Sequence, residues 1–240
     1  MSGTIGRFEP IEQLRAHEYV AEQLRRQIGL HLIPVGHPLP TERELSAMFG
    51  VGRATVEAAI RVLEAERLVE TRRGRKGGTF VIAYGDDELA MDYLLVRLRR
   101  DRDRIKQALQ FRRNVEMFAA ALAAKGRNAG DLEEIRVAHA HTAEGKTDPD
   151  FMRFDTAFHL AIAHAAHNSF VYEAVEQMRL TLSDAVAVLP DSRRWQLRTL
   201  KEHAAVLDAI ERRDADAASE AMGRHVAATE KNVDAMLKAL

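Results

Sequence analysis

The sequence of 240 residues contains no cysteine. Disulfide bonds, cysteine-ligated zinc sites, iron–sulfur clusters and catalysis by a thiol are therefore impossible. The absence also favours a reducing compartment, so we expect a cytoplasmic protein.

Long apolar segments are missing as well. No apolar run approaches the roughly 20 residues needed to cross a bilayer, and the N-terminus lacks the basic-then-apolar layout of a signal peptide. A transmembrane protein is excluded and no membrane partner is expected. Proline (6 residues) and aromatic residues (6%) are scarce, whereas alanine and leucine are abundant. This composition favours a mainly α-helical fold.

The first third of the chain has the pattern of a helix-turn-helix. Apolar residues at four-residue steps predict a helix over 11–30, and a stretch rich in proline and glycine over 34–40 ends it. Thr41 and Glu44 have capping-box spacing and predict the start of a second helix. Gly50-Val51-Gly52 then predicts a tight turn before a third helix over about 53–66, which is the candidate recognition helix.

Two short strands are predicted next, over 68–72 and 78–82. They enclose a basic, glycine-rich tip and therefore predict a β-hairpin. A helix-turn-helix followed by a basic hairpin describes a winged helix-turn-helix domain, which we place at residues 1–85 and expect to bind double-stranded operator DNA. The alternative is a small helical domain whose hairpin is only a solvated turn.

Several motifs in this third resemble the GntR family of bacterial transcription regulators. They include Leu39-Pro-Thr-Glu-Arg-Glu-Leu45, Phe49-Gly-Val-Gly-Arg53 and Gly78-Thr-Phe-Val81. The resemblance implies that Arg43 contacts phosphate, that Arg53 reads bases and that the hairpin enters the minor groove. The predicted DNA-binding residues are Arg43, Arg53, Ala54, Thr55, Glu57, Arg73, Arg75, Lys76 and Gly77.

Two positions depart from the family pattern. Gly52 stands where the family usually has Ser or Thr, and Glu57 stands where it usually has a second base-reading Arg. A carboxylate cannot make the bidentate contact to guanine, although it can accept a hydrogen bond from cytosine. The usual operator sequence of the family is therefore not expected.

Residues 86–240 have helical periodicity throughout and contain only two prolines. We predict seven helices, at about 86–100, 104–125, 131–144, 150–167, 169–189, 192–213 and 214–239. Helices joined by short connections form an antiparallel bundle. The predicted fold class is therefore mainly α, with an N-terminal winged helix-turn-helix and a C-terminal antiparallel bundle of about seven helices.

Several polar side chains lie on faces of this bundle that should be buried. Asp155 and His159 are four residues apart on one helix, and His203 and His225 lie on the apolar faces of two others. Together they could converge on one metal ion, although a hydrogen-bonded core cluster fits the spacing equally well. Arg112 and Glu116 lie in another apolar stripe, where an ion pair within one helical turn is the simplest interpretation. The remaining histidines lack such a setting.

The spacing of Phe154-Asp155-x3-His159, Glu202-His203 and Met222-x2-His225 resembles the FCD effector domain of the FadR subgroup. The resemblance implies that Asp155, His159, His203 and His225 hold a divalent metal ion and that Arg112 faces the same cavity. Such ligands suit Zn²⁺, Ni²⁺ or Mn²⁺ and leave positions open for a small carboxylate effector. The predicted effector-binding residues are Arg112, Glu116 and Asn168.

These patterns predict a metal-dependent, ligand-responsive transcription regulator that senses a small organic acid, and the resemblance implies a repressor. A homodimer is expected because two recognition helices must meet two half-sites. One alternative is a DNA-binding dimer with a purely structural metal and no effector. Another is a metal-dependent hydrolase, but Glu116 is the one candidate general base and Arg112 would occupy it.

Overall fold

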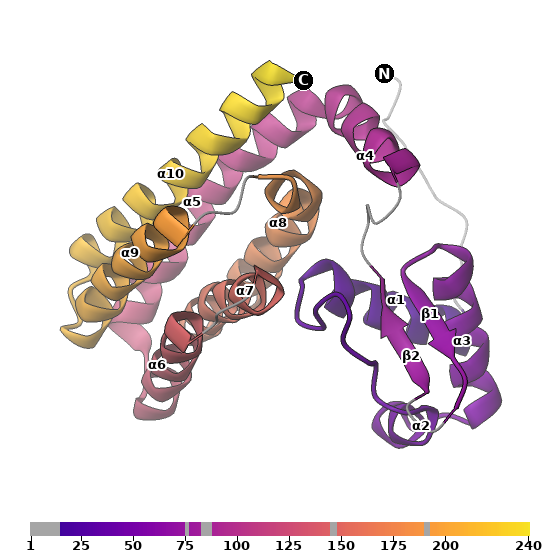
Figure 1. Cartoon of the computed structure of the whole chain (residues 1–240). Coiled ribbons are helices and arrows are strands. Elements are labelled where there is room, and N and C mark those ends of the chain that lie inside the picture. The colour runs from indigo at the N-terminus through magenta and orange to yellow at the C-terminus, as the bar shows by residue number, and fades with distance from the viewer. Residues whose placement is uncertain (1–14, 75–76, 83–87, 145–147, 190–192) are drawn as a thin grey trace, which may run out of the picture.

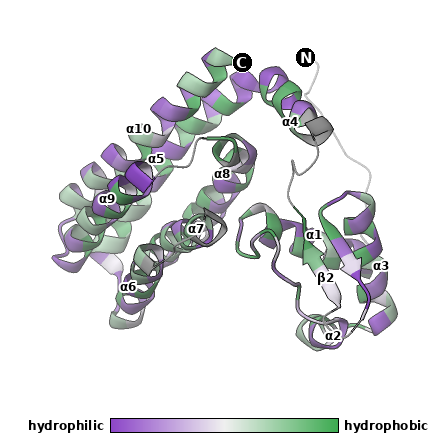
Figure 2. Cartoon of the chain, viewed as in Figure 1, coloured by the Kyte–Doolittle hydropathy of each residue, from purple (hydrophilic) through white to green (hydrophobic). Residues whose placement is uncertain are grey.

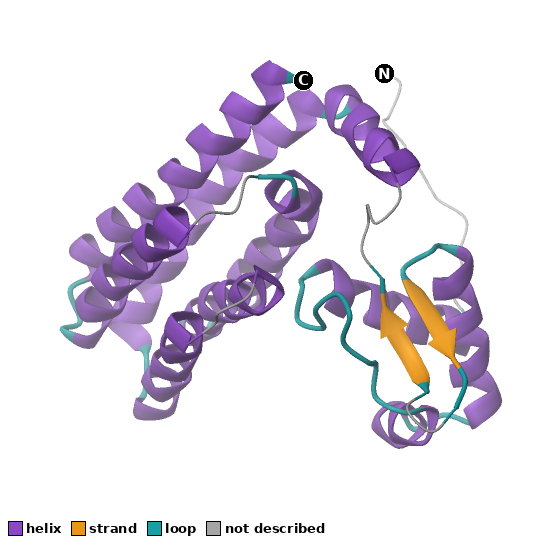
Figure 3. Ribbon diagram, in the orientation of Figure 1, coloured by secondary structure: helices purple, strands orange, loops and turns teal. Residues whose placement is uncertain are grey.

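A computed structural model describes residues 15–74, 77–82, 88–144, 148–189 and 193–240. Within these residues the fold is helical apart from one two-stranded sheet, which confirms the predicted mainly α class (Figure 3). The N-terminal elements are α1 (Ala16–Gly29), α2 (Glu42–Phe49), α3 (Arg53–Ala65), β1 (Val69–Arg72) and β2 (Gly78–Val81). The C-terminal helices are α4 (Glu88–Arg100), α5 (Arg102–Gly126), α6 (Ala129–Glu144), α7 (Asp148–Ala165), α8 (Ser169–Ala187), α9 (Arg193–Glu211) and α10 (Ala215–Ala239).

The N-terminal elements form the predicted winged helix-turn-helix. The capping box is present at the start of α2, because the Thr41 hydroxyl accepts from the Glu44 amide at 3.3 Å and the Glu44 carboxylate accepts from the Thr41 amide at 2.9 Å. Gly50 ends α2 at a φ of +65°, a conformation that glycine adopts without strain. β1 and β2 pair antiparallel, with Val69 opposite Val81.

The C-terminal helices form the predicted bundle, and each lies within a few residues of its predicted bounds. The two longest, α5 and α10, lie side by side, with α9 against α10, α6 against α7 and α8 against α5 (Figure 1). Apolar and polar residues alternate around the helices with helical periodicity (Figure 2). The apolar faces of α5, α6, α7, α9 and α10 form a shared core. Helix α8 contributes to a second apolar cluster, together with residues of α5 and α7.

The structure bears on two further predictions, the absence of membrane-spanning helices and the position of the domain boundary. Among the described helices, none is long and apolar enough to cross a membrane. The expected boundary between residues 1–85 and 86–240 falls within residues 83–87, outside the described part of the chain.

Candidate metal centre and DNA-binding surface

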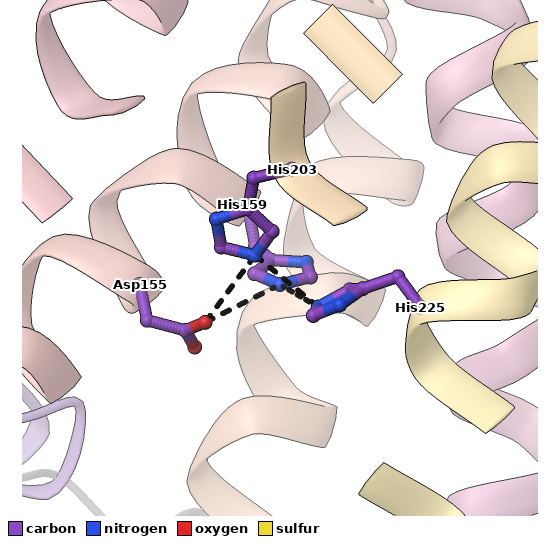
Figure 4. A group of neighbouring side chains, drawn as sticks. All are labelled: Asp155, His159, His203 and His225. Carbon is purple, nitrogen blue, oxygen red and sulfur yellow. Dashed lines mark hydrogen bonds and ion pairs between the residues drawn. The ribbon is translucent and has the colours of Figure 1, made fainter. Parts of the chain in front are cut away.

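Four polar side chains from three helices meet inside the bundle (Figure 4). α7 supplies Asp155 and His159, which share one helical face because they are four residues apart, α9 supplies His203, and α10 supplies His225. All four are buried, and their potential ligand atoms lie within 4.8 Å of one another. The structure thus brings together the four residues that were predicted to bind metal.

Most of the facing atoms have the spacing of neighbouring ligands around one ion, and the contact between Asp155 and His159 is longer. Nε2 of His225 is 3.1 Å from Nε2 of His159 and 3.2 Å from Nε2 of His203. Oδ1 of Asp155 is 3.4 Å from Nε2 of His203 and 4.0 Å from Nε2 of His159. Adjacent ligand atoms that each lie about 2.0–2.2 Å from a common ion are about 3–3.5 Å apart.

Two carboxylates orient the histidine rings from behind. Nδ1 of His159 donates to Glu116, and Nδ1 of His225 donates to Oε2 of Glu202 at 3.0 Å. A ring that donates from Nδ1 in its neutral form has a lone pair on Nε2. Two imidazole lone pairs and the Asp155 carboxylate therefore face the same point.

These acceptors repel one another unless a hydrogen or a positive ion lies between them. The buried Nδ1 of His203 has no hydrogen-bond partner among the described residues, so without an ion the ring hydrogen on Nε2 would point into the cluster, toward Asp155 and His225; a bound ion would take its place. Carboxylates behind the ligating histidines are a common feature of metal sites, since they fix the tautomer and the ring orientation. Three imidazole nitrogens and one carboxylate oxygen also suit first-row divalent ions. The residues present therefore fit a divalent metal ion.

The protonation states at neutral pH suit metal binding. Burial, opposed by the nearby Glu116, lowers the pKa of His159 to about 4. Burial and the adjacent His225 ring lower the pKa of His203 well below its ordinary value. Burial by itself would raise the pKa of Asp155, but Arg179 and the histidines lower it below the ordinary range. His159 and His203 are thus neutral, and Asp155 is ionised.

A cavity of about 30 Å³ lies beside this cluster and is lined by Asp155 and His225. The buried Arg112 also lines it, as predicted from the resemblance, and donates from Nε to Oε1 of Glu116 at 2.5 Å. Glu116 uses its other oxygen for His159 and is not among the lining residues. Glu116 therefore lies behind the cluster, where it orients the His159 ring. The sequence had predicted that it would contact an effector, and the structure gives it this other role.

Asn168 does not lie with the other predicted effector residues. It is exposed and forms the N-cap of α8, where its side-chain oxygen accepts from the amides of Phe170 at 3.1 Å and Val171 at 3.3 Å. The cap satisfies helix-end amides that have no partner within the helix. The structure therefore assigns this side chain a local structural role in place of effector binding.

A second arginine of the cavity wall was missed by the sequence analysis. Arg179 of α8 donates to Oδ2 of Asp155 at 2.6 Å and to the hydroxyl of Thr156 at 2.9 Å. Its buried Nε has no partner among the described residues. The available signal was its position in the otherwise apolar line Val171, Val175 and Leu182, which a buried arginine would occupy only with a partner.

Three of the predicted DNA-binding residues lie together on the winged domain. Arg43, Arg53 and Gly77 line an open groove between the start of α2, the start of α3 and the hairpin. Ala54, Glu57 and Arg73 are exposed and Thr55 is half-buried. Arg75 and Lys76 lie outside the described residues.

The two departures from the family pattern have simple structural settings. Glu57 forms an exposed ion pair with Arg61, one turn along α3, with 2.7 Å between Oε1 and Nη1. Gly52 is the N-cap of α3 and provides no side-chain cap. Nothing in the structure explains what Glu57 gains for DNA recognition.

Comparisons with known proteins agree with this architecture. The family model described as bacterial regulatory proteins, gntR family, matches residues 16–81, and the FCD domain model matches residues 107–228, about half of the chain. The chain belongs to the GntR family. Its two matched regions coincide with the winged helix-turn-helix and with the helices that carry the four-residue cluster.

Relatives of this GntR protein are similar over most of their length. The galactonate operon transcriptional repressor of Escherichia coli strain K12 is 32% identical over 196 residues, which cover 78% of this chain and 82% of that protein. Another protein of that strain, whose name links it to an L-lactate dehydrogenase operon, is 31% identical over 222 residues, 88% of this chain and 84% of its own. The HTH-type transcriptional repressor NanR of Cronobacter sakazakii is 28% identical over 232 residues, 93% of this chain and 86% of its own.

Among solved structures, McbR/YncC of E. coli has a TM-score of 0.52 at 17% identity, covering 95% of this chain and 99% of that chain. This likeness concerns the fold. The family match itself decides between regulator and enzyme: the GntR protein is a DNA-binding transcription regulator with an FCD domain, and the alternative of a metal hydrolase is rejected.

Proposed function

We propose that this GntR regulator is a metal-dependent sensor of a small hydroxy acid, which changes its affinity for operator DNA. The observation that carries the proposal is the cavity shared by a metal-type cluster and two arginines, Arg112 and Arg179. Glu116 and Asp155 balance the charges of the two arginines, so with a metal ion bound an anion that entered this buried cavity would meet net positive charge.

Asp155, His159, His203 and His225 would hold the metal ion, for which Zn²⁺, Ni²⁺ and Mn²⁺ are the candidates. A bound ion would supply positive charge and open coordination positions for a carboxylate. Glu116 and Glu202 would keep the rings in the binding tautomer.

The chemistry of the remaining wall favours an acid that also carries hydroxyl groups. Arg112 and Arg179 present planar guanidinium groups suited to a carboxylate. Thr199, Thr229 and Ser183 add hydroxyls that can bond to those of a ligand. The names of two relatives carry L-lactate and galactonate, both hydroxy acids, and this supports the same class.

We further propose that the protein is a cytoplasmic repressor and a homodimer whose DNA binding the acid relieves. Two of the relatives are named repressors. Two-fold symmetry would place two α3 helices on two half-sites.

Phe111 and Phe118 are 51% and 53% exposed on one face of α5, and such aromatic residues are typical of interfaces. Phe118→Asp would then produce a monomer in sedimentation experiments, whereas Tyr19→Asp, exposed on α1, would not.

Metal analysis and a thermal-shift assay test the proposal directly. Protein purified without chelator or histidine tag would carry about one divalent ion per chain. L-lactate, D-galactonate, L-malate and citrate would be added to the metal-loaded and metal-stripped protein. At least one acid should raise the melting temperature only when metal is present, and no metal-dependent shift with any of them would overturn the proposal.

A matched pair of variants tests the role of the arginine. Arg112→Lys keeps the charge but removes the planar fork, so it should weaken acid binding without removing the metal. Arg113→Lys, at the exposed neighbouring position on α5, is the control and should bind acid as the wild type does.

A purely structural metal is the second candidate function of the cluster. The size of the cavity favours it, since about 30 Å³ holds roughly one water molecule. This candidate predicts that metal removal lowers the melting temperature and that no acid changes it.

A further inference from the structure

The turn that follows α1 belongs to the winged domain in the sequence but is buried in the bundle. Leu30 is 2% exposed and packs among residues of α5, α7 and α8, including Ala119, Leu160 and Val175. In Figure 1 this indigo turn lies beside α7 and α8. An ion pair between Arg26 and Glu176 fixes the same end of α1 to α8.

The next residue, His31, forms part of the cavity wall. Its Nε2 is 3.0 Å from the hydroxyl of Ser183 on α8, and both residues line the cavity together with Arg112 and Arg179. The winged domain therefore contributes an imidazole to a cavity that is otherwise built by the bundle.

His31 has a backbone conformation that is uncommon for a side chain of its size. Its φ is +58°, in the left-handed region that favours glycine. The conformation belongs to the C-terminal cap of α1, in which the Leu32 amide donates to the Gln27 carbonyl at 3.0 Å, and Arg67, His167 and Arg213 adopt it after other helices. Here the buried Leu30 and the bond to Ser183 hold the turn in place.

The cavity is too small for the proposed ligand unless part of its wall moves. A volume of about 30 Å³ accommodates about one water, and even the smallest hydroxy acid is larger. Most lining residues belong to α5, α7, α8, α9 and α10, which are packed against one another. The exception is the segment 29–31, which enters from the winged domain.

We propose that His31 is an acid-contacting residue and that the segment 29–31 is the wall displaced when the acid binds. This inference rests on the proposed function. An acid held by Arg112 and Arg179 would bond to the His31 ring in place of the Ser183 hydroxyl. The ligand would thus contact both the winged domain and the helical bundle directly.

A rigid path leads from this turn to the recognition helix. α1 packs against α3 through one apolar cluster that includes Leu24, Ile28, Val56 and Ile60. Arg25 of α1 also binds Glu66, which directly follows α3, through two bonds of 2.8 and 2.9 Å. A shift of the turn would therefore move α1 and α3 together, as coupling through packed elements requires.

The test compares His31→Gly with His31→Asn in the full-length, zinc-loaded protein. Both residues tolerate a positive φ, so neither adds backbone strain, but only Asn retains hydrogen-bonding groups. His167 is the matched control: its φ is +50° and its ring pairs with Asp131 at 2.9 Å, away from the cavity. Binding of L-lactate, D-galactonate, L-malate and citrate is followed by the fluorescence of Trp195, the sole tryptophan of the chain and a lining residue.

We expect His31→Gly to weaken binding of the responding acid about tenfold or more, as for loss of a hydrogen bond to a charged group. His31→Asn should bind within about threefold of wild type, His167→Gly should match wild type, and zinc affinity should be unchanged in all three. Hydrogen exchange of the amides over 28–33 should also change when the acid is added.

The outcomes separate this inference from the function on which it rests. If the wild type responds to an acid and His31→Gly responds with the same affinity, His31 is not a contact and the inference fails alone. If the amides over 28–33 exchange equally with and without the acid, the proposed displacement of the segment 29–31 is refuted. If the wild type binds zinc but responds to none of the four hydroxy acids, the proposed function fails and the inference fails with it.

Discussion

Oε2 of Glu202 accepts a hydrogen bond from Nδ1 of His225 at 3.0 Å, across the contact between α9 and α10. Glu202 directly precedes His203 in the chain, so neighbouring residues of α9 serve the cluster in two ways. His203 faces its centre, whereas Glu202 holds the His225 ring from outside.

Removal of this carboxylate should weaken metal binding without preventing folding. We expect Glu202→Ala to lower zinc affinity about 10–100-fold, because an unsupported ring loses its preferred tautomer and orientation. Competition with a chelating dye measures the change. Glu220→Ala is the control, since Glu220 is exposed on α10 and only pairs with Arg224. Wild-type affinity in Glu202→Ala would show that the bond has no supporting role.

The metal-free protein should lose stability as the pH falls from about 6.5 to about 4. The pKa of His159 is about 4 in the fold and 6.5 in its ordinary state. Unfolding therefore takes up a proton within this window, and stability rises with pH across it. The full effect from this residue is about 3 kcal/mol. Urea denaturation in the presence of chelator at several pH values measures it, and a flat profile between pH 4 and 6.5 would contradict the assignment.

Arg43 and Arg53 should affect DNA binding in different ways. Arg43→Ala should weaken binding to all sequences, because one phosphate contact is lost. The slope of log K against log salt concentration should become shallower by about one. Arg53→Ala should cost about 1–3 kcal/mol and relax the preference at one base position. Titrations at several salt concentrations, on sites selected from a random pool, distinguish the two. Identical behaviour of both variants would refute the assigned roles.

Gly77→Ala should distort the hairpin and weaken DNA binding. A Cβ at this position would lie 2.5 Å from the carbonyl oxygen of Arg72 and 2.8 Å from that of Gly74, so the backbone would have to shift. Gly52→Ser is the control, because nothing lies within 4 Å of a Cβ there and serine caps α3 slightly better than glycine does. A Gly77→Ala protein with wild-type affinity would show that the hairpin does not contribute to the interface.

The local parts of this protein could be predicted from the sequence because their causes are local. Helical periodicity gave the bundle helices to within a few residues, and the spacing of Thr41 and Glu44 placed the start of α2. Asp155 and His159 share a face because they are four residues apart on one helix. The apolar neighbours of His203 and His225 indicated that both rings point inward.

The tertiary structure decided which inward-facing groups meet and in which role. Glu116 was expected at an effector, but the packing of α5 against α7 places it behind His159. Asn168 was expected at the same site, yet its bonds cap α8, because a helix start satisfies its oxygen locally. Periodicity could not distinguish a capping residue from a ligand contact.

The contribution of the winged domain to the cavity depends entirely on long-range packing. His31 and Ser183 are 152 residues apart in the chain, and Arg179 and Asp155 lie on different helices. A face can be calculated from the sequence of one helix, whereas the partner of that face depends on how all the helices pack. The sequence by itself therefore determined the elements, their buried faces and the metal-type residues, and the tertiary structure alone decided that one cavity joins Arg112, Arg179 and His31.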